Sequence, residues 1–279
     1  MKWYSKAYIG VFLAFLYLPI MVLIIFSFNE SKGRTFTGFS TKWYVELFHN
    51  EAILDALCTT LVVAFISATV ATIMGTAAAI GIEKMDGRLK PMVMNLTYVP
   101  IINPEIITGV SFMLLFVTAK KFFAEVGFDF QFGWLTLIIA HITFNIPYVI
   151  LTVLPKLRQM DKSLIDAAMD LGCNPMQAFT KVTIHEIMPG IVAGFIMALT
   201  FSMDDFVVSY FTTGAEHQPL SVMIYAMTKK RVSPEINALS TMIFLVIMSI
   251  LVAVNVFERR ADAKAKLATR RLKGGAVNE

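Results

Sequence analysis

Six long apolar runs constrain this chain more than any other feature of its sequence. A hydrocarbon core of about 30 Å takes roughly 20 helical residues, and each run is at least that long. Only 16% of the residues are charged and 57% are hydrophobic, a balance typical of polytopic membrane proteins. We therefore expect an all-α integral membrane protein. The expected spans are 8–28, 57–82, 92–117, 134–154, 187–211 and 238–257.

The distribution of lysine and arginine predicts the orientation of these spans. With both termini inside, 16 of the 24 basic residues lie in inner segments, as the positive-inside rule requires. Seven of them lie between Arg259 and Lys273, so the prediction depends largely on the C-terminal tail. We expect one transmembrane domain over 1–260, N-in and C-in, and a basic cytoplasmic tail over 261–279 held against anionic lipid. The net charge of +4 reflects this bias and gives no indication of nucleic-acid binding.

The second and third spans each carry a local signal. The second is rich in small residues, at positions 68, 71, 75 and 79, which let helices approach closely. In the third, Pro100 and Pro104 interrupt the backbone hydrogen bonds, and Glu105 follows at the start of a second half-helix. Either the span is broken beside a cavity, or it has a proline kink with Glu105 near an interface.

The fourth span and one outer segment carry further polar and amphipathic patterns. His141 and Asn145 are four residues apart and share a helix face. They line a path or bond a neighbouring helix, and the second is the commoner fate of such residues. Residues 41–48 have the pattern of a short amphipathic helix outside the bilayer.

Two adjacent acids, Asp204 and Asp205, lie in the otherwise apolar fifth span. A charge at mid-helix costs roughly 2.5–3.5 kcal/mol on insertion scales, so both need a wet cavity, a partner or a cation. On a continuous helix, adjacent side chains point about 100° apart, so we expect one acid to face a path and the other to bond a neighbour. A purely structural role for both is the alternative. Tyr210 follows nearby and is suited to a cation–π contact.

The longest inner loop, 161–190, has its own helical pattern. Asp161 is a candidate N-cap, and Gly172 stands where a helix ends in a left-handed residue. Asn174 then caps a second helix, with Pro175 at its first position and Gln177 completing a capping box. The loop is therefore expected to be helix, glycine turn, helix.

This loop resembles the "EAA" loop of ABC importer permeases. The matching residues are Asp166, Ala167, Ala168, Gly172, Phe179, Pro189 and Gly190. In that family the loop, 161–186 here, forms the coupling helices that seat in a groove of the ATPase. Asp166 replaces the usual glutamate, which preserves the charge. His185 stands where the family often has proline, which leaves the turn before the fifth span in doubt.

The chain also resembles the C-type permease subunits of spermidine/putrescine importers, over essentially its whole length and most densely from 161 to 242. The matching runs are 202–205, 213–214 and 233–238. The resemblance implies the six-helix type I permease fold in the cytoplasmic (inner) membrane. It also implies a heterodimer with a homologous B-type permease, two copies of an ABC ATPase and an external polyamine-binding protein.

We expect no catalytic residues, metal site or bound cofactor in this chain. It lacks a GxxxxGK[ST] motif, so ATP and Mg²⁺ are expected on the partner subunit. Cys58 and Cys173 fall on opposite faces of the membrane and cannot pair. An ABC permease for another solute is the alternative, with cationic or amine cargo favoured over anions by the acids. An intramembrane aspartyl protease is a remote alternative, because two neighbours on one helix cannot share a proton across a site.

Overall fold

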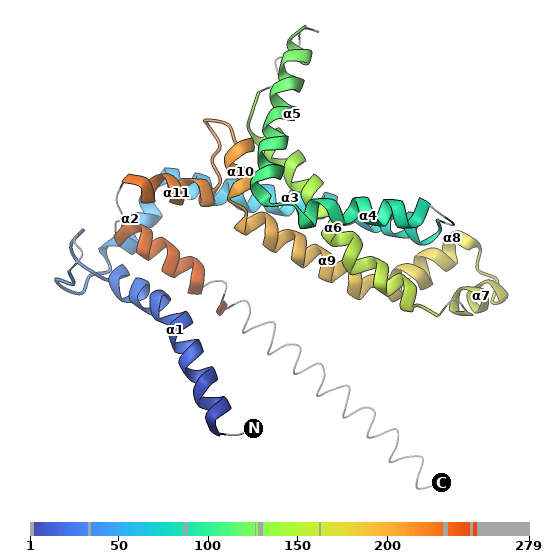
Figure 1. Ribbon diagram of the computed structural model, residues 1–279, viewed down its shortest axis with the longest axis horizontal. Helices are drawn as coiled ribbons and strands as arrows, with labels where there is room; N and C mark the ends of the chain where they lie inside the picture. The colour runs from blue at the N-terminus through green and yellow to red at the C-terminus, as the bar shows by residue number, and fades with distance from the viewer. Residues whose placement is uncertain are drawn as a thin grey trace. The chain divides into compact units, whose positions relative to one another are not determined.

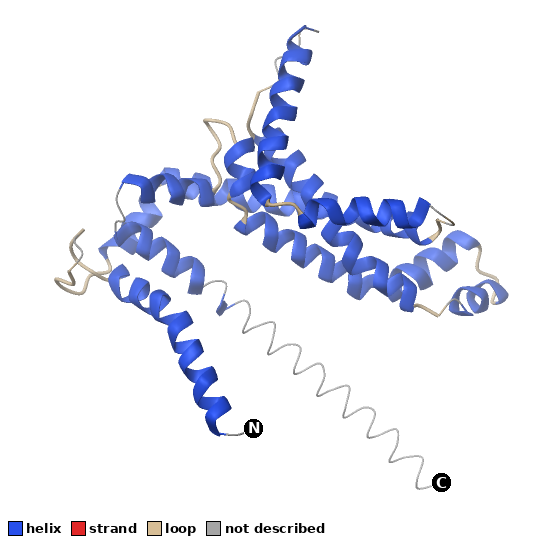
Figure 2. Cartoon of the chain, in the orientation of Figure 1, coloured by secondary structure: helices blue, strands red, loops and turns tan. Residues whose placement is uncertain are grey.

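The computed structural model describes residues 3–32, 35–85, 87, 89–125, 127, 131–161, 163–230, 234–245 and 248–249. These residues are almost entirely helical (Figure 2). The chain divides into two compact units, one formed by Met1–Asn50 with Met227–Glu279, the other by Glu51–Ala226.

The first unit contains α1 (Trp3–Ser27) and α2 (Lys42–His49), and residues 234–245 are helical as well (Figure 1). Helix α2 confirms the short amphipathic helix expected at 41–48. The side chain of Asn29 organises the loop between α1 and α2, because its Oδ1 accepts the N–H of Thr37 at 2.8 Å. Lys32 forms an ion pair with Glu235 at 2.8 Å, which raises the pKa of Lys32.

The second unit is built on α3 (Glu51–Glu83), α6 (Trp134–Gln159) and α9 (Ile184–Asp204), which pack against one another. The small residues of α3 lie in this contact, and Ala68, Ala71 and Ala79 are fully buried. A Cβ added to Gly75 would lie 2.7 Å from the Cβ of Val149 on α6. This confirms that the second span packs among other helices.

The predicted third span is two helices, α4 (Leu89–Ile102) and α5 (Glu105–Glu125). Asn103 and Pro104 separate them, and Glu105 is the first residue of α5. Of the two readings that the prolines left open, the structure shows the broken helix.

The fifth span is also divided, and here the expectation of a continuous helix over 187–211 is wrong. Helix α9 ends at Asp204, Asp205 has an extended backbone with ψ 126°, and α10 (Val207–Thr212) begins two residues later. The geometry of two acids 100° apart on one helix therefore does not apply. Helix α11 (Leu220–Lys230) follows.

The inner loop has the predicted caps. The N–H of Ser163 donates to Asp161 before α7 (Ser163–Asp170), which lowers the pKa of Asp161. Gly172 has φ +88°, and Asn174 and Gln177 form the capping box of α8 (Pro175–Ala178). A π-helical segment, Phe179–Thr183, leads directly into α9, so His185 lies within a helix and not in a turn.

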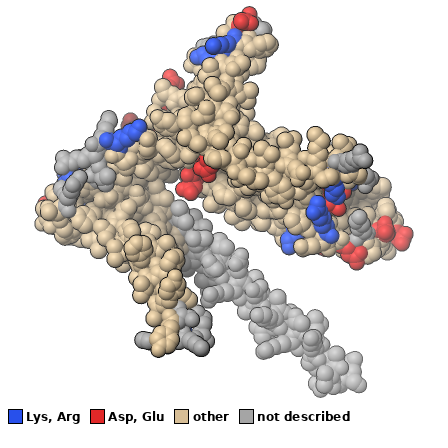
Figure 3. All heavy atoms as spheres, in the orientation of Figure 1, with Lys and Arg blue, Asp and Glu red and all other residues tan. Residues whose placement is uncertain are grey.

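Within the part of the chain that the structure describes, five helices are long and apolar enough to cross a membrane. Helix α5 meets the criterion without α4, whereas the sequence pattern predicts one span over 92–117. Half of the predicted sixth span, 238–257, and all of the tail at 261–279 lie outside the described residues. In Figure 3, uncharged side chains cover most of the second unit, and charges gather near the end that holds α7 and α8.

Candidate functional site

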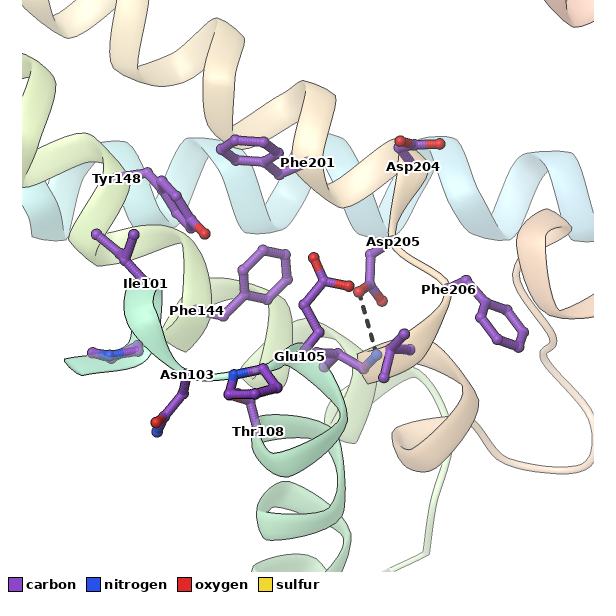
Figure 4. Close-up of a pocket in the computed structure, with 14 residues that line it drawn as sticks. Ile101, Asn103, Glu105, Thr108, Phe144, Tyr148, Phe201, Asp204, Asp205 and Phe206 are labelled. Atoms are coloured by element: carbon purple, nitrogen blue, oxygen red, sulfur yellow. Dashed lines mark hydrogen bonds between the residues drawn. The ribbon is translucent and has the colours of Figure 1, made fainter. Parts of the chain in front are cut away.

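The two breaks meet at a cavity of about 390 Å³ in the second unit. Its walls come from the α4–α5 break, from α6 and from the α9–α10 break (Figure 4). The lining residues are Pro100, Ile101, Asn103, Pro104, Glu105, Thr108, Phe144, Tyr148, Phe201, Asp204, Asp205, Phe206, Val207 and Val208.

Asp205 is the buried acid of this site. Its side chain is 7% exposed and accepts the backbone N–H groups of Val208 at 3.2 Å and Ser209 at 2.7 Å. It therefore acts as the N-terminal cap of α10, since those amides have no partner within the helix. The backbone carbonyl of Asp205 accepts the hydroxyl of Ser221 at 2.7 Å.

Glu105 and Asp204 are the exposed acids of the site. In Figure 4 the carboxylates of Glu105 and Asp205 point toward one another, although they come from helices about 100 residues apart in the chain. Asp204 lies at the edge of the cavity, with its carboxylate turned away from Glu105. The structure thus brings together three of the four residues predicted for the path.

The fourth predicted residue, Tyr210, is not among the lining residues. It is 45% exposed and packs its ring against Phe206, with centroids 5.6 Å apart. The aromatic walls come from four other residues: Phe144, Tyr148, Phe201 and Phe206.

Sequence reasoning missed these walls, although a spacing signal was available. Phe144 and Tyr148 are four apart, so they share a face of α6. Phe201 precedes Asp205 by four residues, and its ring lies 4.5 Å from that of Tyr148.

This arrangement suits an organic cation. Three carboxylates and four aromatic rings line the cavity, and none of its lining residues in the described part of the chain is Lys, Arg or His. Carboxylates bind ammonium groups through charged hydrogen bonds, and aromatic faces attract them through their quadrupoles. Among the residues described, no group of three or more His, Cys, Asp or Glu is placed to hold a metal ion.

The inner loop presents a second candidate surface. Its exposed apolar side chains include Leu171 at 87% and Met176 at 69%, in a segment that the sequence places outside the bilayer. Of the predicted coupling residues, Asp166, Ala167 and Gly172 are exposed, and Ala168 and Phe179 are half-buried. Exposed apolar groups of this kind make the loop a candidate docking surface.

The fold and these two surfaces define a multi-pass membrane protein of the transport class. The model of the family described as "Binding-protein-dependent transport system inner membrane component" matches residues 71–267. The chain belongs to this family.

Two curated relatives support this assignment. The chain is 36% identical over 247 residues to the spermidine/putrescine transport system permease protein PotC of Escherichia coli (strain K12), covering 88% of this chain and 90% of that protein. It is 38% identical over 232 residues to the putrescine transport system permease protein PotI of the same strain, covering 82% and 81%.

A solved structure shares the fold. It is a bacterial ABC transporter involved in the import of the acidic polysaccharide alginate, with a TM-score of 0.74. The match is 19% identical and covers 92% of this chain and 94% of that chain. At this identity the similarity concerns the fold alone.

Proposed function

We propose that this chain is a permease subunit of an ATP-driven importer that moves spermidine and putrescine across the cytoplasmic (inner) membrane. The observation that carries the cargo assignment is the cavity at the two helix breaks. Glu105 and Asp205 face one another there without a basic side chain among the lining residues that the structure describes. The names of the two curated relatives, both polyamine permeases, support the same cargo.

The charge of the site explains how it would hold a polyamine. Two carboxylates that face one another repel, and an ammonium between them removes that repulsion. Asp204 at the edge of the cavity offers a further negative charge to a second ammonium group. The rings of Tyr148 and Phe201 form an apolar wall for the methylene chain that joins the ammonium groups.

The energy for transport comes from a partner in this proposal, because the sequence has no GxxxxGK[ST] motif. Two copies of an ABC ATPase bind ATP and Mg²⁺ and engage the loop at 161–190, with Asp166, Ala167, Ala168, Gly172 and Phe179 as the coupling residues. A homologous permease forms the second half of the path, and an external binding protein delivers the polyamine.

A permease for another amine or cation is the second candidate, since the same acids and rings suit any ammonium group. The fold alone does not identify the cargo, because a structure with the same fold belongs to an importer of an acidic polysaccharide.

Uptake of labelled polyamine tests the proposal directly. The chain is expressed with its partner subunits in a strain that lacks polyamine uptake and synthesis, and labelled spermidine and putrescine are supplied. We expect ATP-dependent uptake that unlabelled polyamine suppresses and that lysine or sulfate at the same concentration does not. Uptake that lysine suppresses equally well would favour the second candidate, and absence of polyamine uptake would contradict the proposal.

A further inference from the structure

We propose that His141 and Asn145 are positioning residues for transport. Each binds one half of the divided fifth span to α6, and together they hold Asp205 at the cavity. Neither residue lines the cavity itself. This inference rests on the proposed function, because it assumes that the cavity is the cargo path.

His141 binds the outer half. Its Nε2 lies 3.1 Å from the hydroxyl of Ser209 and 3.7 Å from Oδ2 of Asp205, and its side chain is 1% exposed. Ser209 also donates its backbone N–H to Asp205. Helix α10 has only six residues, too few to be stable alone, so contacts from other helices must set its position.

Asn145 binds the inner half. Its Nδ2 donates to the hydroxyl of Ser202 at 2.7 Å, and both side chains are buried. The hydroxyl of Ser202 also lies 3.0 Å from that of Ser67 on α3, a hydrogen bond in which either hydroxyl can donate. A chain of hydrogen bonds therefore joins α6, α9 and α3.

The spacing of the two residues explains why they act together. His141 and Asn145 lie one turn apart on α6, and Ser202 and Ser209 lie on either side of the break in the fifth span. The same helix carries Phe144 and Tyr148 in the cavity wall. Helix α6 thus fixes the carboxylate of Asp205 and the opposing aromatic faces relative to each other.

A double-mutant comparison tests the role of His141. Uptake of labelled spermidine is measured in proteoliposomes that contain the full complex with its ATPase and binding protein. His141→Phe should lower the maximal rate about fivefold, the factor expected for one lost hydrogen bond. In an Asp205→Asn background the same change should lower it less than twofold, because the residue acts through Asp205. His141→Gln, which keeps a hydrogen-bonding amide, should restore most of the rate.

Asn145→Leu and Ser202→Ala give an independent test on the other half-helix. Each should lower the rate, and the double variant should be no worse than either single variant. Thr152→Val is the matched control on α6, since that hydroxyl donates to the carbonyl of Val149 in its own helix. It should transport at the wild-type rate.

The outcomes separate the two proposals. The positioning role would be overturned if His141→Phe lowered the uptake rate by the same factor in the wild-type and Asp205→Asn backgrounds. Uptake at the wild-type rate by both His141→Phe and Asn145→Leu would overturn it as well. If His141→Phe fails to assemble, His141→Gln and the Asn145 series decide the question. Wild-type uptake by Glu105→Gln and Asp205→Asn would instead remove the cavity from the path, and the positioning role with it.

Discussion

The two divided spans are interrupted by different means. Between α4 and α5 the interruption lies in the local sequence, where Pro100 and Pro104 remove backbone donors and Glu105 begins the next helix. Between α9 and α10 neither residue of the break is Pro or Gly, and the break depends on Asp205 and its partners. One break is therefore specified by covalent structure, and the other by hydrogen bonds.

This difference separates two roles of a carboxylate. Glu105 follows a break that the prolines maintain, so under the proposed function its charge serves the cargo and not the break. Asp205 both caps a helix and faces the cavity, so removing it alters the site and the fold together. The predictions below test this separation.

Replacement of Asp205 by alanine should have the largest effect. Loss of the cap costs roughly 0.5–2 kcal/mol, and the cavity also loses a charge. We expect uptake to fall more than tenfold and the purified complex to melt at a lower temperature. Asp205→Asn should lose uptake with a smaller change in melting temperature, since asparagine also caps helices. Unchanged melting of Asp205→Ala would show that the cap is dispensable.

Glu105→Gln should affect transport alone. Loss of a charged hydrogen-bond partner corresponds to about 1.5–3 kcal/mol, so uptake should fall about tenfold or more. Thermal melting of the complex should stay near that of the wild type, because Pro104 still separates the helices. Parallel melting and uptake assays give the result. A fall in stability equal to that of Asp205→Ala would end the distinction between the two breaks.

Gly172→Val extends the comparison to an interruption outside the bilayer. With φ +88°, a side chain at this position is disfavoured by roughly 1–2 kcal/mol. Both membrane breaks stay intact, so membrane insertion should be normal while association with the ATPase weakens and uptake falls several-fold. Pull-down of the ATPase with the inserted permease measures the first effect. Wild-type association together with wild-type uptake would remove the loop from the coupling role.

Pro104→Ala should have a smaller effect than these. Alanine removes one steric obstacle to a continuous helix, but Pro100 remains in the last turn of α4. We expect roughly a twofold fall in uptake with no loss of thermal stability. A large loss of stability would mean that tertiary contacts, rather than the prolines, maintain this break as well.

Thiol labelling should leave transport unchanged and establish the orientation of the chain that carries both breaks. In the predicted N-in orientation, Cys173 faces the cytoplasm and Cys58 lies at the outer edge of its span. An impermeant maleimide should label Cys58 and spare Cys173 in intact cells or spheroplasts. Labelling of Cys173 from outside would reverse the orientation and place the coupling loop on the wrong face.

Local sequence signals were sufficient to predict much of the structure of this protein. Apolar run length predicts the membrane class, and the small residues of α3 predict its burial. The prolines predict the α4–α5 break, and Asn174 with Gln177 predicts the start of α8. Each of these signals acts within a few residues of the chain, where backbone sterics and capping dominate.

The break at Asp205 and the cavity walls became apparent only in the tertiary structure. At the break at Asp205 the contacts of that residue with Val208 and Ser209 are local, but His141 on α6 and Ser221 on α11 lie far from it in the sequence. The same holds for the cavity walls: Tyr148 and Phe201 are 53 residues apart, and only the packing of α6 against α9 brings their rings together. Hydrogen bonds and ring contacts between distant segments have no periodicity in the sequence, so the cavity becomes visible only when the helices are assembled.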